Sequence, residues 1–155
     1  MTSKMMNGIM FIIAGLGSIA VYIGLGETGI LDKSHTEKIA AYTLLAIPLA
    51  FMMTRKIQNN SFVDAGLLII IVGLTIGLVS DAISSAEISA ESKSIGDVIA
   101  WTGWSTMYFG MFISGLGYLR TTLFPQWLSG LLTIASFVFF AFIAVLNSDQ
   151  LAQNE

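Results

Sequence analysis

Few side chains in this chain could carry out chemistry. Only 11% of its 155 residues are Asp, Glu, Lys or Arg, and it has one histidine, His35, and no cysteine. The missing cysteines remove disulfides, thiol nucleophiles and thiolate metal sites. One histidine cannot supply the paired axial ligands of a bis-histidine haem or the converging ligands of a copper or di-iron centre. We therefore expect no catalytic residue, no metal site and no cofactor of its own, and we interpret His35 as a solvated loop residue.

Four aromatic residues could instead hold an apolar ligand. At 100° per residue they fall on one side of a helix over residues 98–118: Trp101, Trp104, Tyr108 and Phe112. Such a face could stack against a quinone, a pigment or a lipid tail. The alternative is that the tryptophans, together with Trp127, form the aromatic belts found where membrane helices meet water.

The elements that would position these residues are five apolar stretches, at residues 5–25, 39–54, 62–80, 98–118 and 127–146. A hydrocarbon core about 30 Å thick needs about 20 apolar residues per helix, and four of the five approach that length. None carries an ionisable residue near its centre, where such residues usually mark proton relays or ion paths. The sequence predicts an all-α integral membrane protein, with residues 1–155 forming one domain built as a five-helix bundle.

Two stretches differ from the others. The second is short and contains Pro48, which predicts a kinked helix. The first is longer than the apolar core of a signal peptide and is interpreted as a retained span. Residues 81–97 are predicted to be an outer loop, able to form a short helix on the membrane surface.

The lysines and arginines of the loops predict an orientation. Four would lie on one face (Lys4, Arg55, Lys56 and Arg120) and three on the other (Lys33, Lys38 and Lys93). The loops of the first face are shorter, and their charges lie closer to the helix ends. By the positive-inside rule we predict a cytoplasmic N-terminus and an outside C-terminus.

Most acidic residues near helix starts have a structural interpretation. The Ser/Thr-x-x-acid pattern of a helix cap occurs at Ser34–Glu37, Ser61–Asp64 and Ser94–Asp97. We therefore interpret Glu37, Asp64 and Asp97 as capping residues. Pro125 is placed in the first turn of the last helix, where proline is tolerated.

Small residues recur along single helix faces and predict close helix–helix packing. The clearest are Gly73, Gly77, Gly103, Gly110, Ser114 and Gly117. In the first stretch Gly8, Gly15 and Ser18 share one side, and Gly17 and Gly24 lie on the other. We interpret that helix as packed between two neighbours.

Two functions fit these observations. The first is a non-catalytic accessory or scaffold subunit of a larger integral membrane complex, contacting other membrane subunits and lipid, with bound lipid as a candidate ligand. The alternative is a small transporter, channel or lipid-handling protein lined by hydroxyl groups, at Ser18, Tyr42, Thr75, Thr106, Ser114, Thr133 and Ser136. No basic cluster points to nucleic acid.

The segment Leu123–Gly130 resembles a helix start in some uncharacterised prokaryotic multi-spanning proteins. The matching pattern is Pro-x-Trp-Leu-x-Gly, and the resemblance covers eight residues. It implies a prokaryotic cell membrane, and those proteins bring no established activity.

Overall fold

The computed structural model describes residues 3–86 and 89–145, and within these ranges it contains helices and no strand. The chain divides into two compact units, Met1–Ile57 and Gln58–Glu155, called here the N-terminal and C-terminal units. Each is described by itself. The single membrane domain expected for residues 1–155 stays a prediction.

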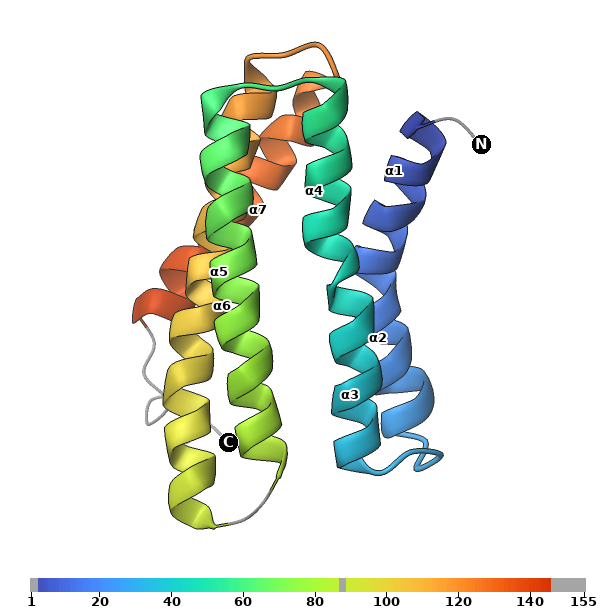
Figure 1. The fold of residues 1–155 in the computed structure, drawn as a ribbon, viewed down its shortest axis with the longest axis vertical. Helices are drawn as coiled ribbons and strands as arrows, with labels where there is room; N and C mark the ends of the chain where they lie inside the picture. The colour runs from blue at the N-terminus through green and yellow to red at the C-terminus, as the bar shows by residue number, and fades with distance from the viewer. Residues whose placement is uncertain (1–2, 87–88, 146–155) are drawn as a thin grey trace. The chain divides into compact units, whose positions relative to one another are not determined.

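The N-terminal unit is a helical hairpin (Figure 1). Its first helix is built from α1 (Ser3–Ile12), the π-helical turn η1 (Ile13–Gly17), α2 (Ser18–Val21) and a second π-helical turn, η2 (Tyr22–Gly26). It returns through α3 (Lys33–Leu44) and α4 (Ala46–Ile57), which are separated by Leu45. Gly29, with φ at 73°, lies in the turn that joins the two arms, a conformation that glycine adopts without strain.

Pro48 explains the break between α3 and α4. Proline has no N–H to donate to the carbonyl four residues earlier, which belongs to Leu44, and its ring crowds that carbonyl. Helix α3 ends at Leu44. The kink predicted at Pro48 is therefore present. The span of 39–54 was predicted too short, because the apolar helix extends over Ser34–Ile57, or 24 residues.

Contacts along the whole hairpin set the register of its two arms. Asn7 on α1 is hydrogen-bonded to Thr54 on α4, with 2.9 Å from Nδ2 to Oγ1. One turn further along, the rings of Phe11 and Phe51 meet edge to face, with centroids 5.4 Å apart. Near the turn, a Cβ placed on Gly26 would lie 2.9 Å from Cγ2 of Thr36. The glycine thus permits a close approach of η2 to α3.

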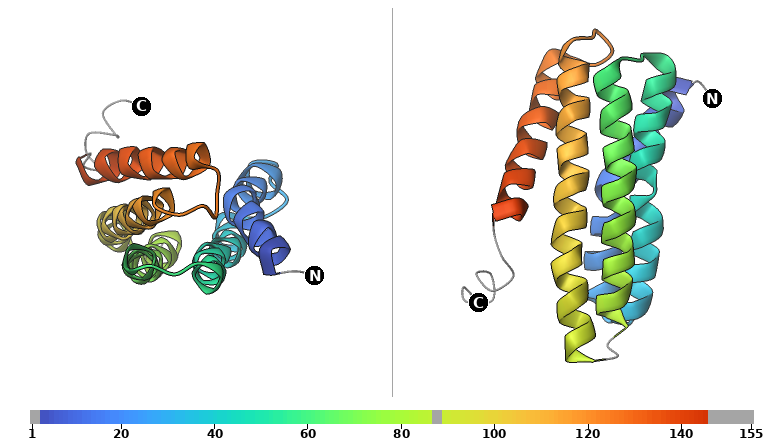
Figure 2. Two further views of the ribbon diagram at one scale, coloured as in Figure 1. Left: turned by 90° about the horizontal axis from the view of Figure 1, so that it is seen from above. Right: turned by 60° about the vertical axis from the view of Figure 1, so that its left-hand side comes forward.

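The C-terminal unit consists of α5 (Ser61–Ser85), α6 (Ala90–Leu119) and α7 (Gln126–Val145). The three helices lie side by side in both views of Figure 2, with α6 between α5 and α7. Successive helices run in opposite directions. The predicted end of the last stretch, Leu146, lies outside the described residues.

The loop predicted over residues 81–97 is too long at both ends, because the helices on either side extend into it. Helix α5 continues to Ser85 and α6 already begins at Ala90. The reason is that polar residues in this segment bond across the helix pair, with Ser84 Oγ donating to Asp97 Oδ1 at 2.8 Å. A Cβ on Gly96 would lie 2.9 Å from the Ser84 backbone nitrogen, so the helices also touch closely here. Residues 87–88 lie outside the described residues.

Among the described residues, four helices are long and apolar enough to cross a membrane: Met5–Gly26, Ser34–Ile57, Ser61–Ser85 and Gln126–Val145. Helix α6 contains the predicted stretch 98–118 and is 30 residues long, but it is not among the four. Its many glycine, serine, tryptophan and tyrosine residues lower its apolar character. The described residues therefore show four candidate spans where the sequence predicted five.

The helix caps differ from those predicted. The side chains that accept the first backbone hydrogen bonds belong to Asp32, Asn60 and Ser89, because each helix begins earlier than its Ser/Thr-x-x-acid pattern implied. His35 consequently lies in the first turn of α3 and not in a loop. Pro125 precedes the first turn of α7, and its carbonyl accepts from the Leu128 and Ser129 amides.

Asn60 joins the ends of two helices. Its Oδ1 accepts from the Val63 amide at 3.0 Å, which caps α5, and its Nδ2 donates to the Gly117 carbonyl in the last turn of α6 at 3.3 Å. We expect Asn60→Ala to destabilise the protein by about 1–2 kcal/mol. Thermal unfolding in detergent, followed by circular dichroism, measures the change. Asn59→Ala, at the adjacent exposed asparagine, is the matched control, and equal losses in both variants would refute the role given to Asn60.

Candidate functional site

The six residues predicted to mediate close packing lie at the contact between α5 and α6. A Cβ on Gly73 would overlap the backbone nitrogen of Met107 and lie 2.7 Å from its Cα. A Cβ on Gly110 would lie 2.6 Å from the Ile70 nitrogen. These helices therefore meet backbone to backbone, which small residues permit.

The remaining packing residues complete the same contact. A Cβ on Gly103 would overlap the Gly77 nitrogen, and one on Gly77 would lie 2.9 Å from the Trp104 ring. Gly117 faces Asn60 Oδ1, at 2.8 Å from such a Cβ. Ser114 is fully buried against Gly66, and its hydroxyl has no hydrogen-bond partner among residues 3–86 and 89–145. The glycines of α5 and α6 are thus occupied within the C-terminal unit.

The four aromatic candidates of α6 do not form one open surface. Tyr108 stacks on Phe139 of α7 with centroids 5.1 Å apart, and Phe112 contacts Phe137 at 5.2 Å. Trp104 covers Gly77 of α5, and its Nε1 donates to Asp81 Oδ1 at 3.4 Å. Trp101 is half-buried. Tyr108 and Phe112 thus contact α7, whereas Trp104 contacts α5.

Three of the seven hydroxyl groups proposed to line a path are hydrogen-bonded within their own helices. Thr75 donates to the Ile71 carbonyl at 2.8 Å, Thr106 to that of Thr102 at 2.7 Å, and Thr133 to that of Ser129 at 2.7 Å. Such bonds to the preceding turn satisfy the hydroxyl without a ligand. Ser136 is buried and Tyr42 is exposed. Ser18 is half-buried.

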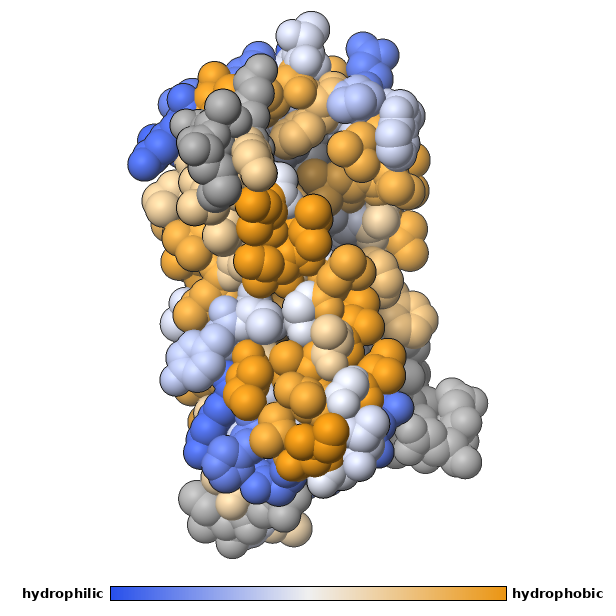
Figure 3. Space-filling view, turned by 90° about the vertical axis from the view of Figure 1, so that its right-hand side faces the viewer, coloured by the Kyte–Doolittle hydropathy of each residue, from blue (hydrophilic) through white to orange (hydrophobic). Residues whose placement is uncertain are grey.

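The first helix presents an open surface. A Cβ on Gly8, Gly15 or Gly24 would meet nothing within 4 Å, whereas Gly17 lies against Thr43, whose Cβ would be 3.0 Å away. One side of the helix thus packs on α3, and among the described residues of the N-terminal unit nothing covers Gly8 or Gly15 on the other side. In the apolar 18-residue segment of Met5–Gly26, 6% of the residues are buried, against 39% in the corresponding segment of α5. In the space-filling view, apolar side chains run through the middle of the visible face and hydrophilic ones gather toward its ends (Figure 3).

A buried polar pair in the N-terminal unit was not predicted. Asn7 and Thr54 are 5% and 0% exposed, and the Thr54 hydroxyl lies within hydrogen-bond distance of both Asn7 side-chain atoms and of the Ala50 carbonyl. The available signal was Asn7 itself, the only carboxamide among residues 5–25. Its partner lies 47 residues away, so the pairing could not be read from local spacing.

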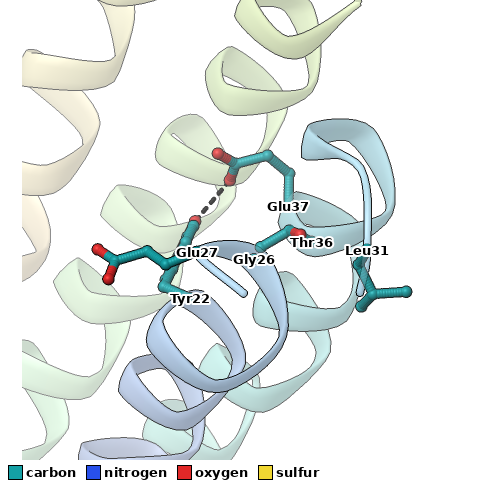
Figure 4. Close-up of a pocket in the computed structure, with 6 residues that line it drawn as sticks. All are labelled: Tyr22, Gly26, Glu27, Leu31, Thr36 and Glu37. Carbon is teal, nitrogen blue, oxygen red and sulfur yellow. Dashed lines mark hydrogen bonds between the residues drawn. The ribbon is translucent and has the colours of Figure 1, made fainter. Parts of the chain in front are cut away.

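An open pocket of about 330 Å³ lies at the turn of the hairpin, lined by Tyr22, Gly26, Glu27, Leu31, Thr36 and Glu37. The Tyr22 hydroxyl donates to Glu37 Oε2 at 2.5 Å. Figure 4 shows these two side chains turned toward each other, with Glu27 extending beside Tyr22. Glu37, interpreted from the sequence as a cap, is a wall of this pocket instead.

Asp32 and His35 form an exposed pair next to the pocket. The Asp32 carboxylate accepts from the His35 amide at 2.9 Å and lies 2.6 Å from the ring Nδ1. The hydrogen bond from the His35 amide, followed by that from its ring, holds the pKa of Asp32 below its ordinary value. The pair orders the start of α3, which carries Thr36 and Glu37 into the pocket.

Within the described residues, no group of three or more His, Cys, Asp or Glu side chains is arranged to hold a metal ion. Comparison with protein-family models, with curated proteins and with solved structures finds no match to this chain. The function is therefore inferred from the chain's own residues.

Proposed function

We propose that the chain is a multi-pass membrane protein that crosses the membrane five times, with its N-terminus in the cytoplasm and its C-terminus outside. The four apolar helices supply four of these spans. Helix α6 supplies the fifth, because its contacts with α5 and α7 place it between two such helices. The loop lysines and arginines support the orientation, and the resemblance at Leu123–Gly130 supports a prokaryotic cell membrane.

In that membrane we propose that the chain is a non-catalytic accessory subunit of a larger integral membrane complex. The observation that carries this proposal is the open side of the first helix, where Gly8 and Gly15 meet no described residue of the N-terminal unit within 4 Å. Small residues let a second helix approach closely, and association of membrane helices depends on such packing. The glycines of α5 and α6 do not support this proposal, since they pack against other residues of the C-terminal unit.

Native gel electrophoresis after gentle extraction from the source membrane tests this role, with mass spectrometry to identify the chains that co-migrate. We expect the wild-type chain to co-migrate stoichiometrically with other membrane subunits, and Gly15→Leu to abolish co-migration by filling the docking side. Gly130→Leu is the matched control, because Gly130 also has nothing within 4 Å but lies on α7. Migration of the wild type as a lone 16.7 kDa chain or as a homo-oligomer would contradict the proposal.

The second candidate function is a small lipid-handling or transport protein. The pocket lined by Tyr22 and Glu37 favours it, and the internally bonded threonines of α5, α6 and α7 speak against a hydroxyl-lined path.

A further inference from the structure

We propose that the pocket at the turn of the N-terminal hairpin binds an organic monocation, with a quaternary ammonium group seated between Tyr22 and the carboxylates of Glu27 and Glu37. The described residues that line the pocket all belong to the N-terminal unit. The pocket is separate from Gly8 and Gly15 on the first helix. The proposal can therefore be tested independently of the proposed subunit role.

Size and lining argue for an organic ligand over a metal ion. A hollow of about 330 Å³ is far larger than a bare cation, and it falls in the range of small-molecule sites. Gly26, Leu31 and the ring of Tyr22 give it apolar walls. Among the described residues, no cluster of acidic or histidine ligands is arranged around it for metal coordination.

Charge argues for a cation. Two of the six lining residues, Glu27 and Glu37, are acidic, and none of the six is basic. The pocket also lies at the C-terminal end of the first helix, where backbone carbonyls carry partial negative charge. At the start of the neighbouring α3, the Asp32 carboxylate is hydrogen-bonded to the His35 ring. Lys38 on the same helix is exposed.

The Tyr22–Glu37 hydrogen bond gives the site a fixed wall. The Tyr22 hydroxyl holds Glu37 Oε2 at 2.5 Å (Figure 4), which orients the carboxylate beside the phenol ring. An alkylated ammonium group placed here is attracted by the quadrupole of the aromatic ring and by the negative charge of the carboxylate. Leu31 supplies apolar contact for the alkyl groups.

Choline and its neutral isostere 3,3-dimethylbutan-1-ol test the proposal directly. The full chain is reconstituted in nanodiscs of phosphatidylglycerol, which lack choline, and each compound is titrated by calorimetry. We expect choline to bind and the isostere to bind at least about fivefold more weakly, since only the charge differs. Equal binding of the two compounds, or no binding of choline, would overturn the proposal.

Variants locate the site. Glu37→Gln is expected to weaken choline binding about fivefold, and Tyr22→Phe to weaken it less, because the ring remains. Glu91→Gln, at an exposed acid in the first turn of α6, should leave binding unchanged. Should Glu37→Gln fail to fold, Glu27→Gln takes its place. Full affinity in a folded Glu37→Gln or Glu27→Gln protein would refute the assignment.

A last comparison separates the two sources of such a group. In nanodiscs containing phosphatidylcholine, a lower apparent affinity for free choline would show that the lipid headgroup occupies the pocket. An unchanged affinity would assign the pocket to a soluble cation. Both results support the chemistry proposed here and differ only in where the ligand comes from.

Discussion

Gly73→Ala is expected to destabilise the protein by about 3 kcal/mol, although it adds a single methyl group. That methyl would overlap the Met107 nitrogen and lie 2.8 Å from the Gly103 carbonyl oxygen. Both obstacles are backbone atoms, so no side-chain rotation relieves the clash, and α5 and α6 must separate. Alanine has the higher helix propensity by about 1 kcal/mol. A net loss of stability would therefore come from packing and not from local preference.

Gly15→Ala is the matched control, because it is the same substitution in a helix where the new methyl meets nothing within 4 Å. We expect this variant to be as stable as the wild type or more stable by up to about 1 kcal/mol. Thermal or denaturant unfolding in detergent, followed by circular dichroism, compares the two. Similar stabilities for Gly73→Ala and Gly15→Ala would show that the α5–α6 contact is looser than described.

Thr54→Val should also destabilise the protein, by about 1–2 kcal/mol. Valine keeps the shape of threonine but removes the hydroxyl to which Asn7 Nδ2 donates, and it leaves that amide buried without this partner. In the proposed membrane setting an unmade polar contact is not replaced by water. Thr75→Val is the control, since the Thr75 hydroxyl bonds only to the preceding turn of its own helix on an exposed face.

A double-mutant cycle with Asn7→Ala isolates the pairwise part of this effect. The coupling between Asn7 and Thr54 is expected at about 0.6–1.7 kcal/mol, between the mean and the maximum found for polar pairs between membrane helices. Additive losses would mean that the two residues act independently, and the hydrogen bond would then not be what holds α1 on α4.

The helices could be predicted from the sequence because long apolar runs leave few alternatives. The first helix, α5 and α7 begin within a residue or two of the predicted stretches, and Pro48 marked its kink through its missing N–H. Helix α5 runs past its predicted end. The C-terminal end of α5 and the start of α6 could not be predicted, since Ser84 and Asp97 are polar residues that remain helical by bonding to each other. That pairing exists only once the two helices lie side by side.

The candidate site could likewise be predicted from the sequence only in part. Glycines seven residues apart on α6 could be placed on one face from spacing alone. Which of them pack within the chain, and which stay open as Gly8 and Gly15 do, depends on the register between helices. The pocket was not predicted because Tyr22 and Glu37 belong to different arms of the hairpin and meet only through the turn at Gly29.

Whether α6 crosses the membrane decides the five-span account, and the absence of native cysteine makes it measurable with single-cysteine variants. Ala86, directly after α5, and Thr122, beyond the C-terminal end of α6, are both exposed and lie on opposite sides of α6 in the chain, so each is replaced by cysteine. On intact cells, a membrane-impermeant maleimide should label Ala86→Cys, and it should label Thr122→Cys only after lysis. Labelling of both from the same side would contradict the account, because α6 would then not span the membrane.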